Sequence, residues 1–379
     1  MDRQDLHRNF LHHLLTLRDD CVQQVRLVTR LCHDALLGGD HAERTFVFLP
    51  DLHLLSRGAE AQYHYSFHAI EPGRFVQRDV LLDRLCGVLL EFGQQLPPEH
   101  TVKTIQLGDF LDLWRENEFA ADDVTALVAR ILNDNPEARR RLVRVDAASL
   151  EPDVLLGNHD LKMLHSIELS HARRAFTYAV GDRRSLLVTH GDLFDALEGL
   201  LDDDLQDWFL ERFGGGVSAH RYALDRTIPQ PEEQIMGSEG TAPVVIAHED
   251  EELPEVVNVW ATAAASEERA LTQSHGLLPK ALEFAAGLRA GSPDHLRAME
   301  LASPLPELRT IVIGHSHQAR ICLHRNAHDP GNNLVLVDCG AWIESVQFGD
   351  AVVPSCQIGV LCGGDMRIYQ LDPHVRLMQ

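Results

Sequence analysis

Five short apolar runs recur along this 379-residue chain, and each is followed at once by residues whose side chains can bind metal ions. The runs cover residues 45–49, 102–107, 154–156, 185–189 and 310–313. Stretches with apolar residues at helical spacing intervene, at 76–92 and 124–132. Strands that alternate with helices predict an α/β layered fold with a polar site at the carboxyl ends of the strands. The nearly continuous apolar character of the runs predicts sheets that are covered on both faces.

Further elements are expected on either side of this pattern. Residues 334–337, 357–361 and 366–371 predict three more strands, and residues 10–37 predict one or two amphipathic helices that end at Gly38. The chain divides into an N-terminal helical segment (1–40), a first part of the core (41–194), an insertion (195–306) and a second part of the core (307–379). The insertion has acidic clusters, a triple glycine and helical patterns at 205–213 and 277–288. This insertion could form either a lid over a site or a passive surface segment.

The polar segments after the strands have complementary chemistry. They are Asp51-Leu52-His53, Gly108-Asp109-Phe110-Leu111-Asp112, Gly157-Asn158-His159-Asp160, His190-Gly191-Asp192 and Gly314-His315-Ser316-His317. Carboxylate, imidazole and amide groups without a thiolate suit Mn, Fe, Zn or Ni better than a structural zinc cage. Asp109 has two carboxylate oxygens and can bridge two cations. Two metals roughly 3.5–4 Å apart activate a shared water and neutralise charge on a phosphoryl group.

The five segments, in this order, resemble the motifs of the calcineurin-like metallophosphoesterase superfamily. The resemblance implies a layered β-sandwich flanked by helices (αββα) and a binuclear centre, with manganese as the expected metal. It implies that one metal is held by Asp51, His53, Asp109 and His317. It implies that the second is held by Asp109, Asn158, His190 and His315, with Asp109 bridging.

The same resemblance implies a hydrolase that uses a metal-bridging hydroxide. His159 matches the histidine that serves the leaving oxygen, and Asp112 matches the carboxylate that orients it. Asn158 and Arg115 are the expected substrate contacts; an ordinary surface charge is the alternative for Arg115. The expected substrate is a phosphorylated small molecule that is cleaved at a phosphodiester or pyrophosphate bond.

A finer resemblance concerns the branch that contains UDP-2,3-diacylglucosamine hydrolases. It rests on the segments around Asp51, Asp109 and His190, whereas the long acidic insertion departs from a lipid-processing enzyme. Leu113-Trp114 replaces the Arg-Gly of serine/threonine protein phosphatases. The alternatives are a phosphomonoesterase, including a phosphoprotein phosphatase, a nuclease, and a non-catalytic scaffold of the same fold.

Charge and cysteine content limit the partners and the compartment. The formal net charge of −23 disfavours binding to nucleic acid, and to membranes other than peripherally. Seven cysteines, with no Cys-x-x-Cys pair, favour a reducing compartment. The N-terminal residues lack a signal-peptide pattern and no apolar run reaches membrane-spanning length, so a cytoplasmic location is expected. No oligomeric state follows from these features.

Overall fold

The computed structural model describes most of the chain outside residues 195–276. The described residues are 3–19, 21–32, 44–59, 78–113, 116, 124–143, 149–160, 163, 166, 168–180, 183–194, 277–317, 319–324, 333–342, 344–347, 351–354 and 356–373. The helices are α1 (Arg3–Leu15), α3 (Arg78–Gln95), α4 (Val124–Asp134), α5 (Pro136–Ala138), α11 (Leu277–Ala290) and α12 (Pro293–Ala298). Shorter helical turns are η1 (Thr16–Asp19), η3 (Arg139–Val143) and η5 (Asp192–Phe194).

The first sheet has six strands in the order β1-β13-β12-β2-β3-β4. Their bounds are β1 (Val22–Cys32), β13 (Asp365–Pro373), β12 (Gln357–Cys362), β2 (Arg44–Leu49), β3 (Thr101–Gln106) and β4 (Asp153–Val154). β2, β3 and β4 are parallel to one another, and β12 pairs antiparallel with β2. The carboxyl ends of β2, β3 and β4 therefore meet at one edge of this sheet.

The second sheet has five strands in the order β5-β6-β7-β9-β8. Their bounds are β5 (Ala175–Val180), β6 (Arg183–Thr189), β7 (Thr310–Ile313), β9 (Leu334–Asp338) and β8 (Arg320–His324). β6, β7 and β9 run parallel, and the two edge strands are antiparallel to their neighbours. A separate hairpin joins β10 (Glu344–Gln347) to β11 (Ala351–Pro354).

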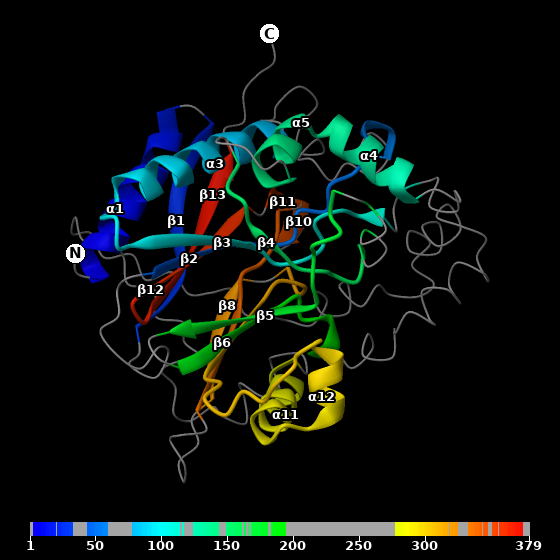
Figure 1. The fold of residues 1–379 in the computed structure, drawn as a ribbon. Helices are drawn as coiled ribbons and strands as arrows, with labels where there is room; N and C mark the ends of the chain where they lie inside the picture. The colour runs from blue at the N-terminus through cyan, green and yellow to red at the C-terminus, as the bar shows by residue number, and fades with distance from the viewer. Residues whose placement is uncertain are drawn as a thin grey trace.

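The two sheets stack between helices, which confirms the layered α/β sandwich expected from the sequence (Figure 1). Along β2, side chains alternate between two cores, as the two-residue period of a strand requires. Val47 and Leu49 pack in a core with side chains of α1, α3 and α4. Phe46 and Phe48 pack between the sheets, against side chains from β6, β7 and β9. Both faces of the first sheet are thus buried, as predicted.

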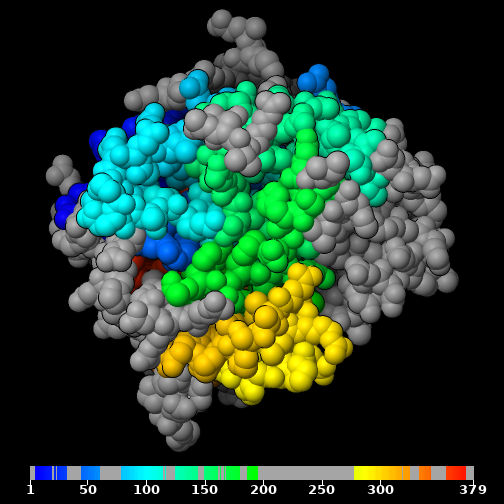
Figure 2. All heavy atoms as spheres, viewed as in Figure 1, coloured from blue at the N-terminus to red at the C-terminus, as the bar shows by residue number. Residues whose placement is uncertain are grey.

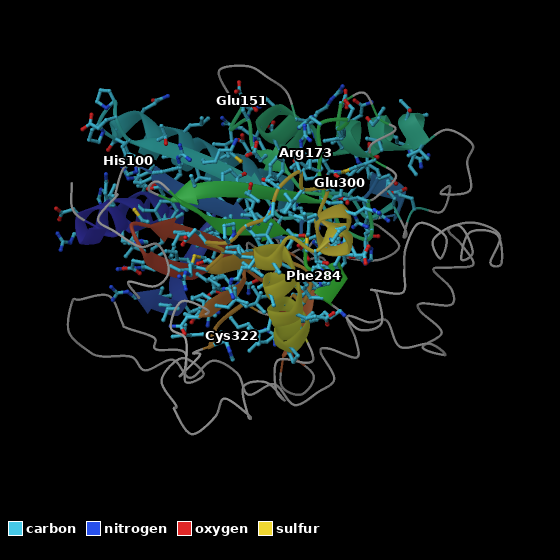
Figure 3. The ribbon with its side chains drawn as sticks, turned by 60° about the horizontal axis from the view of Figure 1, so that its bottom comes forward. His100, Glu151, Arg173, Phe284, Glu300 and Cys322 are labelled. Carbon is cyan, nitrogen blue, oxygen red and sulfur yellow. The ribbon has the colours of Figure 1, made fainter. Side chains whose placement is uncertain are left out.

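The outer face of the second sheet is covered by α11. Its buried residues are Leu277, Leu278, Ala281, Phe284, Ala285 and Leu288, a helical spacing that places one stripe toward the sheet. They share a core with Leu187 and Ile311 of the sheet. Figure 3 shows Phe284 on this helix, with Cys322 of the same core on the sheet. In Figure 2, α3 (cyan) and the α11–α12 segment (yellow) lie on opposite sides of the green segments near residues 150–194.

The helices α11 and α12 lie within the predicted insertion at 195–306. The helix predicted at 277–288 is confirmed, because α11 covers those residues. Residues 195–276, with the helix predicted at 205–213, lie outside the described residues. The lid and the passive insertion both stay predictions for them.

The helical prediction for residues 10–37 is wrong in its second half. α1 ends at Leu15, and residues 22–32 form β1, which pairs antiparallel with β13 along its length. Val22, Val25 and Val28 imitate helical spacing, but β-branched side chains favour strands. The deciding factor is tertiary, because β13 offers a sheet edge to which this segment hydrogen-bonds. None of the described helices is long and apolar enough to cross a membrane.

Candidate metal centre

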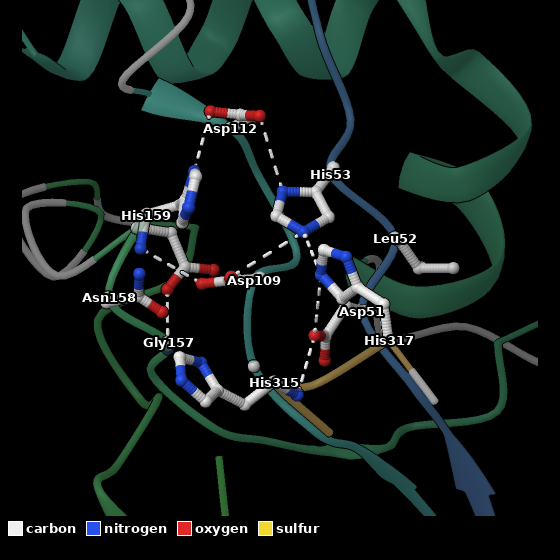
Figure 4. Close-up of polar contacts among 12 residues, drawn as sticks. Asp51, Leu52, His53, Asp109, Asp112, Gly157, Asn158, His159, His315 and His317 are labelled. Atoms are coloured by element: carbon white, nitrogen blue, oxygen red, sulfur yellow. Dashed lines mark hydrogen bonds and ion pairs between the residues drawn. The ribbon is translucent and has the colours of Figure 1, made fainter. Parts of the chain in front are cut away.

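The five polar segments follow β2, β3, β4, β6 and β7, and the structure brings them together between the carboxyl ends of the two sheets. Backbone hydrogen bonds join their loops. The amides of Leu52 and His53 both donate to the carbonyl of Asp109, at 3.1 and 2.8 Å. The amide of Gly314 donates to the carbonyl of His190 at 3.0 Å. The five segments therefore meet at the strand ends, where the sequence places the candidate site (Figure 4).

Asp51, His53 and His317 form the first cluster of ligand-type atoms. Nε2 of His53 and Nε2 of His317 are 3.1 Å apart, and Nε2 of His317 is 3.4 Å from Oδ2 of Asp51. All three side chains are buried. Their ligand atoms lie within 4.8 Å of one another, which is the arrangement of donors around a single ion.

His190 is the centre of the second cluster. Its Nε2 lies 2.9 Å from Oδ1 of Asn158 and 3.3 Å from Nδ1 of His315. Its Nδ1 lies 3.0 Å from the carbonyl oxygen of Leu107, so an N–H at Nδ1 donates there and leaves Nε2 to ligate. The structure thus places Asn158, His190 and His315 beside one another, as the expected second ligand set requires.

Asp109 lies between the two clusters. Its Oδ2 is 3.6 Å from Nε2 of His53 and 3.4 Å from Nε2 of His190, one nitrogen from each cluster. Its other oxygen, Oδ1, accepts the backbone N–H of His159 at 3.0 Å. One carboxylate therefore faces both groups, which is the position that a bridging ligand needs.

The donor set fits divalent metal ions. Oδ1 of Asp51 and Oδ2 of Asp109 are buried and accept no hydrogen bond from the residues that the structure describes. A buried carboxylate oxygen that accepts no hydrogen bond is costly, and a cation removes that cost. Burial by itself would lower the pKa of His190, but Asp109 and Asp51 outweigh it and hold the pKa well above its ordinary value. The cage therefore favours positive charge, and a metal would compete with a proton for His190.

Backbone geometry at the centre is strained at the ligand positions. His53, Asp109, His315 and His317 have positive φ angles of 44°, 45°, 68° and 55°. Residues other than glycine avoid this region unless the surrounding structure holds them there, and such residues gather at functional sites. Their occurrence at four predicted ligands indicates that the loops are shaped by the demands of the site.

Two motif glycines allow ligands from other segments to approach. A Cβ added at Gly157 would lie 1.9 Å from Oδ1 of Asp109, and one added at Gly314 would lie 2.0 Å from Oδ1 of Asp51. Both distances are far inside van der Waals contact. The centre therefore requires glycine at both positions, since any side chain would displace a carboxylate.

His159 and Asp112 form the expected pair. Nδ1 of His159 lies 2.9 Å from Oδ1 of Asp112, and both side chains are buried. His159 also stands with His53 and Asp109 in a third group of possible metal-binding atoms, so ligation is a second role that its position allows. Arg115, the expected phosphate contact, lies outside the described residues.

Two supporting residues were not predicted. Asp160 accepts the amides of Phe110 at 2.7 Å through Oδ2 and of Gly157 at 2.7 Å through Oδ1, so it joins two ligand segments. Burial and the nearby Asp109 raise the pKa of Asp160 well above its usual range. Its place in a motif was the only signal in the sequence.

Arg78, at the start of α3, is the other supporting residue. Its buried guanidinium donates to the carbonyl of Leu52 at 2.7 Å and to that of His53 at 3.3 Å. It therefore holds the backbone of the first ligand segment. Nothing in the sequence near Arg78 marks it, because the contact spans 25 or 26 residues.

No protein-family model and no curated protein matches this sequence. Among solved structures, the chain is similar to a dimetal phosphatase from Danio rerio, with 12% identity, a TM-score of 0.32, and coverage of 87% of this chain and 99% of that one. It is also similar to a conserved uncharacterized protein from Streptococcus pneumoniae TIGR4, described as a predicted phosphoesterase. That match has 8% identity, a TM-score of 0.29, and coverage of 88% of this chain and 92% of the other. Both similarities are remote.

Proposed function

We propose that this chain is a metal-dependent phosphoesterase with two metal ions at the centre described above. The observation that supports it most strongly is Oδ2 of Asp109, a buried carboxylate oxygen that lies within 3.6 Å of an imidazole nitrogen from each cluster. Asp51, His53, Asp109 and His317 would hold one ion, and Asp109, Asn158, His190 and His315 the other. Bound divalent metals would supply a nucleophilic hydroxide near neutral pH and neutralise charge on the phosphoryl oxygens.

His159 would serve the leaving group. Its Nδ1 donates to Asp112, so Nε2 is the ring atom that would deliver a proton to the departing oxygen. The Asp112 carboxylate holds the ring and stabilises the positive charge of the protonated imidazole. Burial of both groups excludes water from this hydrogen bond. The chain's own residues thus provide both the ligands and a proton donor on one side of the centre.

The finer expectations stay predictions. They are a diester or pyrophosphate bond, manganese as the metal, and a likeness to UDP-2,3-diacylglucosamine hydrolases. The test is an assay of the purified protein, loaded with Mn²⁺, on bis-(p-nitrophenyl) phosphate and p-nitrophenyl phosphate, with and without a chelator. We expect hydrolysis that is lost with the chelator and is faster for the diester. Preference for the monoester would favour a phosphomonoesterase. No metal-dependent hydrolysis of either compound, or of nucleotide diphosphates, would exclude the proposal.

The roles of Asp109 and His159 are separable by substitution. Asp109→Ala should abolish activity and metal occupancy together, because both clusters lose a ligand. His159→Ala should lower turnover by about 10²- to 10⁴-fold, the usual contribution of general acid–base catalysis, and retain both metals. Metal content by elemental analysis and turnover are measured on the same samples. Loss of a metal from His159→Ala would instead assign His159 to the ligand set.

A further inference from the structure

Asp112 lies between two histidines to which the proposed function gives different roles (Figure 4). Its Oδ1 is 2.9 Å from Nδ1 of His159, and its Oδ2 is 3.3 Å from Nδ1 of His53. All three side chains are buried. The rings of His53 and His159 meet edge to face, with centroids 4.8 Å apart. One carboxylate therefore faces both a candidate metal ligand and the candidate proton donor.

The carboxylate beside His53 favours one orientation of its ring nitrogens. Nδ1 lies 3.3 Å from Oδ2 of Asp112, within ion-pair distance but without the geometry of a hydrogen bond. A carboxylate only accepts protons from a donor, so a proton at Nδ1 would face this charge and Nε2 would keep its lone pair. That Nε2 points into the centre, 3.1 Å from Nε2 of His317 and 3.6 Å from Oδ2 of Asp109. A carboxylate on the far nitrogen of a ligating histidine orients the ring and raises its basicity.

The backbone repeats this double connection. The amide of Asp112 donates to the carbonyl of Leu54 at 3.0 Å, beside His53. The amide of the next residue, Leu113, donates to the carbonyl of His159 at 3.2 Å. The Asp112 segment is thus joined to the loop of each histidine by main chain as well as by side chain. A movement of either loop acts on the same carboxylate.

We propose that Asp112 is a shared positioning residue, which orients His53 for the first metal and His159 for the leaving group. The His159 half of this inference rests on the proposed function; the His53 half concerns metal binding alone. Because the two oxygens of Asp112 belong to one rigid group, binding of the first metal and alignment of His159 are mechanically linked. Among the candidate metal ligands, the contacts above join Asp112 to His53 of the first set, whereas His190 and His315 belong to the second.

The test compares Asp112→Asn with His159→Ala. Mn²⁺ is titrated into each metal-free protein by calorimetry, and thermal unfolding is measured in parallel. An asparagine oxygen accepts from one imidazole, and its NH₂ group faces the other donor, so one contact is lost. We expect Asp112→Asn to weaken one binding event about 10- to 100-fold and leave the other unchanged. We expect His159→Ala to leave both unchanged.

Two further variants sharpen the comparison. Asp153→Asn is the matched control, since Asp153 accepts Tyr178 Oη at 2.5 Å and pairs with Lys103 at 2.7 Å away from the centre; it should bind Mn²⁺ like the wild type. Asp112→Glu keeps the charge, but its extra methylene prevents both oxygens from matching two fixed rings. It should show the same selective loss as Asp112→Asn.

The role of Asp112 toward His159 is tested by turnover on the phosphate esters of p-nitrophenol and of phenol. Asp112→Asn and His159→Ala should both lose more activity on the phenol ester than on the p-nitrophenol ester. Phenolate is the more basic leaving group, so its departure depends more on a proton donor. Wild-type affinity at both sites in Asp112→Asn would overturn the proposal, and so would equal weakening of both sites with a lower unfolding temperature. If the wild type binds two Mn²⁺ but hydrolyses no ester, the proposed function fails, while the calorimetric comparison still decides the role of Asp112 toward His53.

Discussion

At the scale of single residues, glycines determine how closely the ligand segments can approach. Gly157 lies against Asp109 and Gly314 against Asp51, residues that are distant in the sequence but adjacent at the centre. In each pair, the missing Cβ leaves room for a carboxylate that belongs to another strand end. The ligand geometry thus depends on residues that bind nothing themselves.

Gly157→Ala adds only one methyl group, but it should reduce both the stability of the protein and its affinity for Mn²⁺. The added methyl group would overlap Oδ1 of Asp109 and cost about 1–3 kcal/mol of stability, as overpacking usually does. We also expect Mn²⁺ affinity to fall, because Asp109 must move. The control is Gly87→Ala in α3, where the nearest atom of a described residue to the new Cβ would be Nη2 of Arg141, at 3.7 Å. That change should stabilise the protein by about 1 kcal/mol. Urea unfolding and calorimetry that show equal behaviour of the two variants would refute this interpretation.

At the scale of elements, α1 is attached to the first sheet through a buried polar cluster. His7 of α1 is 1% exposed and its Nε2 lies 3.1 Å from the carbonyl oxygen of Asp365 on β13. Arg30 and Arg367 pair with the same Asp365 at 2.9 and 2.8 Å. Burial, aided by the two arginines and opposed by Asp365, lowers the pKa of His7 from 6.5 to about 4. The folded protein therefore holds this imidazole neutral.

This shift predicts a loss of stability in mild acid. The unfolded chain binds a proton near pH 6.5 that the folded protein refuses until about pH 4. The contribution of His7 is thus complete above pH 6.5, falls as the pH drops, and is lost by pH 4. A shift of this size corresponds to about 3 kcal/mol. The lowered pKa of Asp365 adds its own loss only below the usual carboxyl range of about 3.8.

His7→Gln should flatten the dependence of the free energy of unfolding on pH between 4 and 6.5, as measured by urea unfolding. His12→Gln changes an exposed histidine on the same helix and should keep the wild-type slope. An unchanged slope in His7→Gln would show that another group causes the acid sensitivity.

At the scale of the whole molecule, the candidate centre joins the two sheets. Asp51, Asp109 and Asn158 follow strands of the first sheet, whereas His190 and His315 follow strands of the second. The apolar core between the sheets and the bond from Tyr178 to Asp153 make further connections. Ions at the centre would bind ligands from both sheets, and only in the folded state.

Metal binding should therefore stabilise the entire fold. Mn²⁺ at about 100 to 1,000 times its dissociation constant should add about 3–4 kcal/mol, and a chelator should remove this gain. Differential scanning calorimetry with and without the chelator measures it. Asp109→Ala should show almost no gain. An equal gain in Asp109→Ala would mean that the ions bind elsewhere, for example at surface carboxylates of this acidic chain.

The sequence alone determined the layered α/β class and the strand ends that carry the candidate site, because strand periodicity and ligand-type residues are local patterns. It did not reveal β1, whose valines imitate a helix until β13 provides a partner. Nor did it reveal Arg78 or the contact of Asp112 with His53, since these interactions join segments that are distant in the chain. Tertiary structure alone decided how the segments meet. The five segments with ligand-type residues are thus more than a set of donors: Asp109 lies between two clusters of them, and Asp112 lies between His53 and His159.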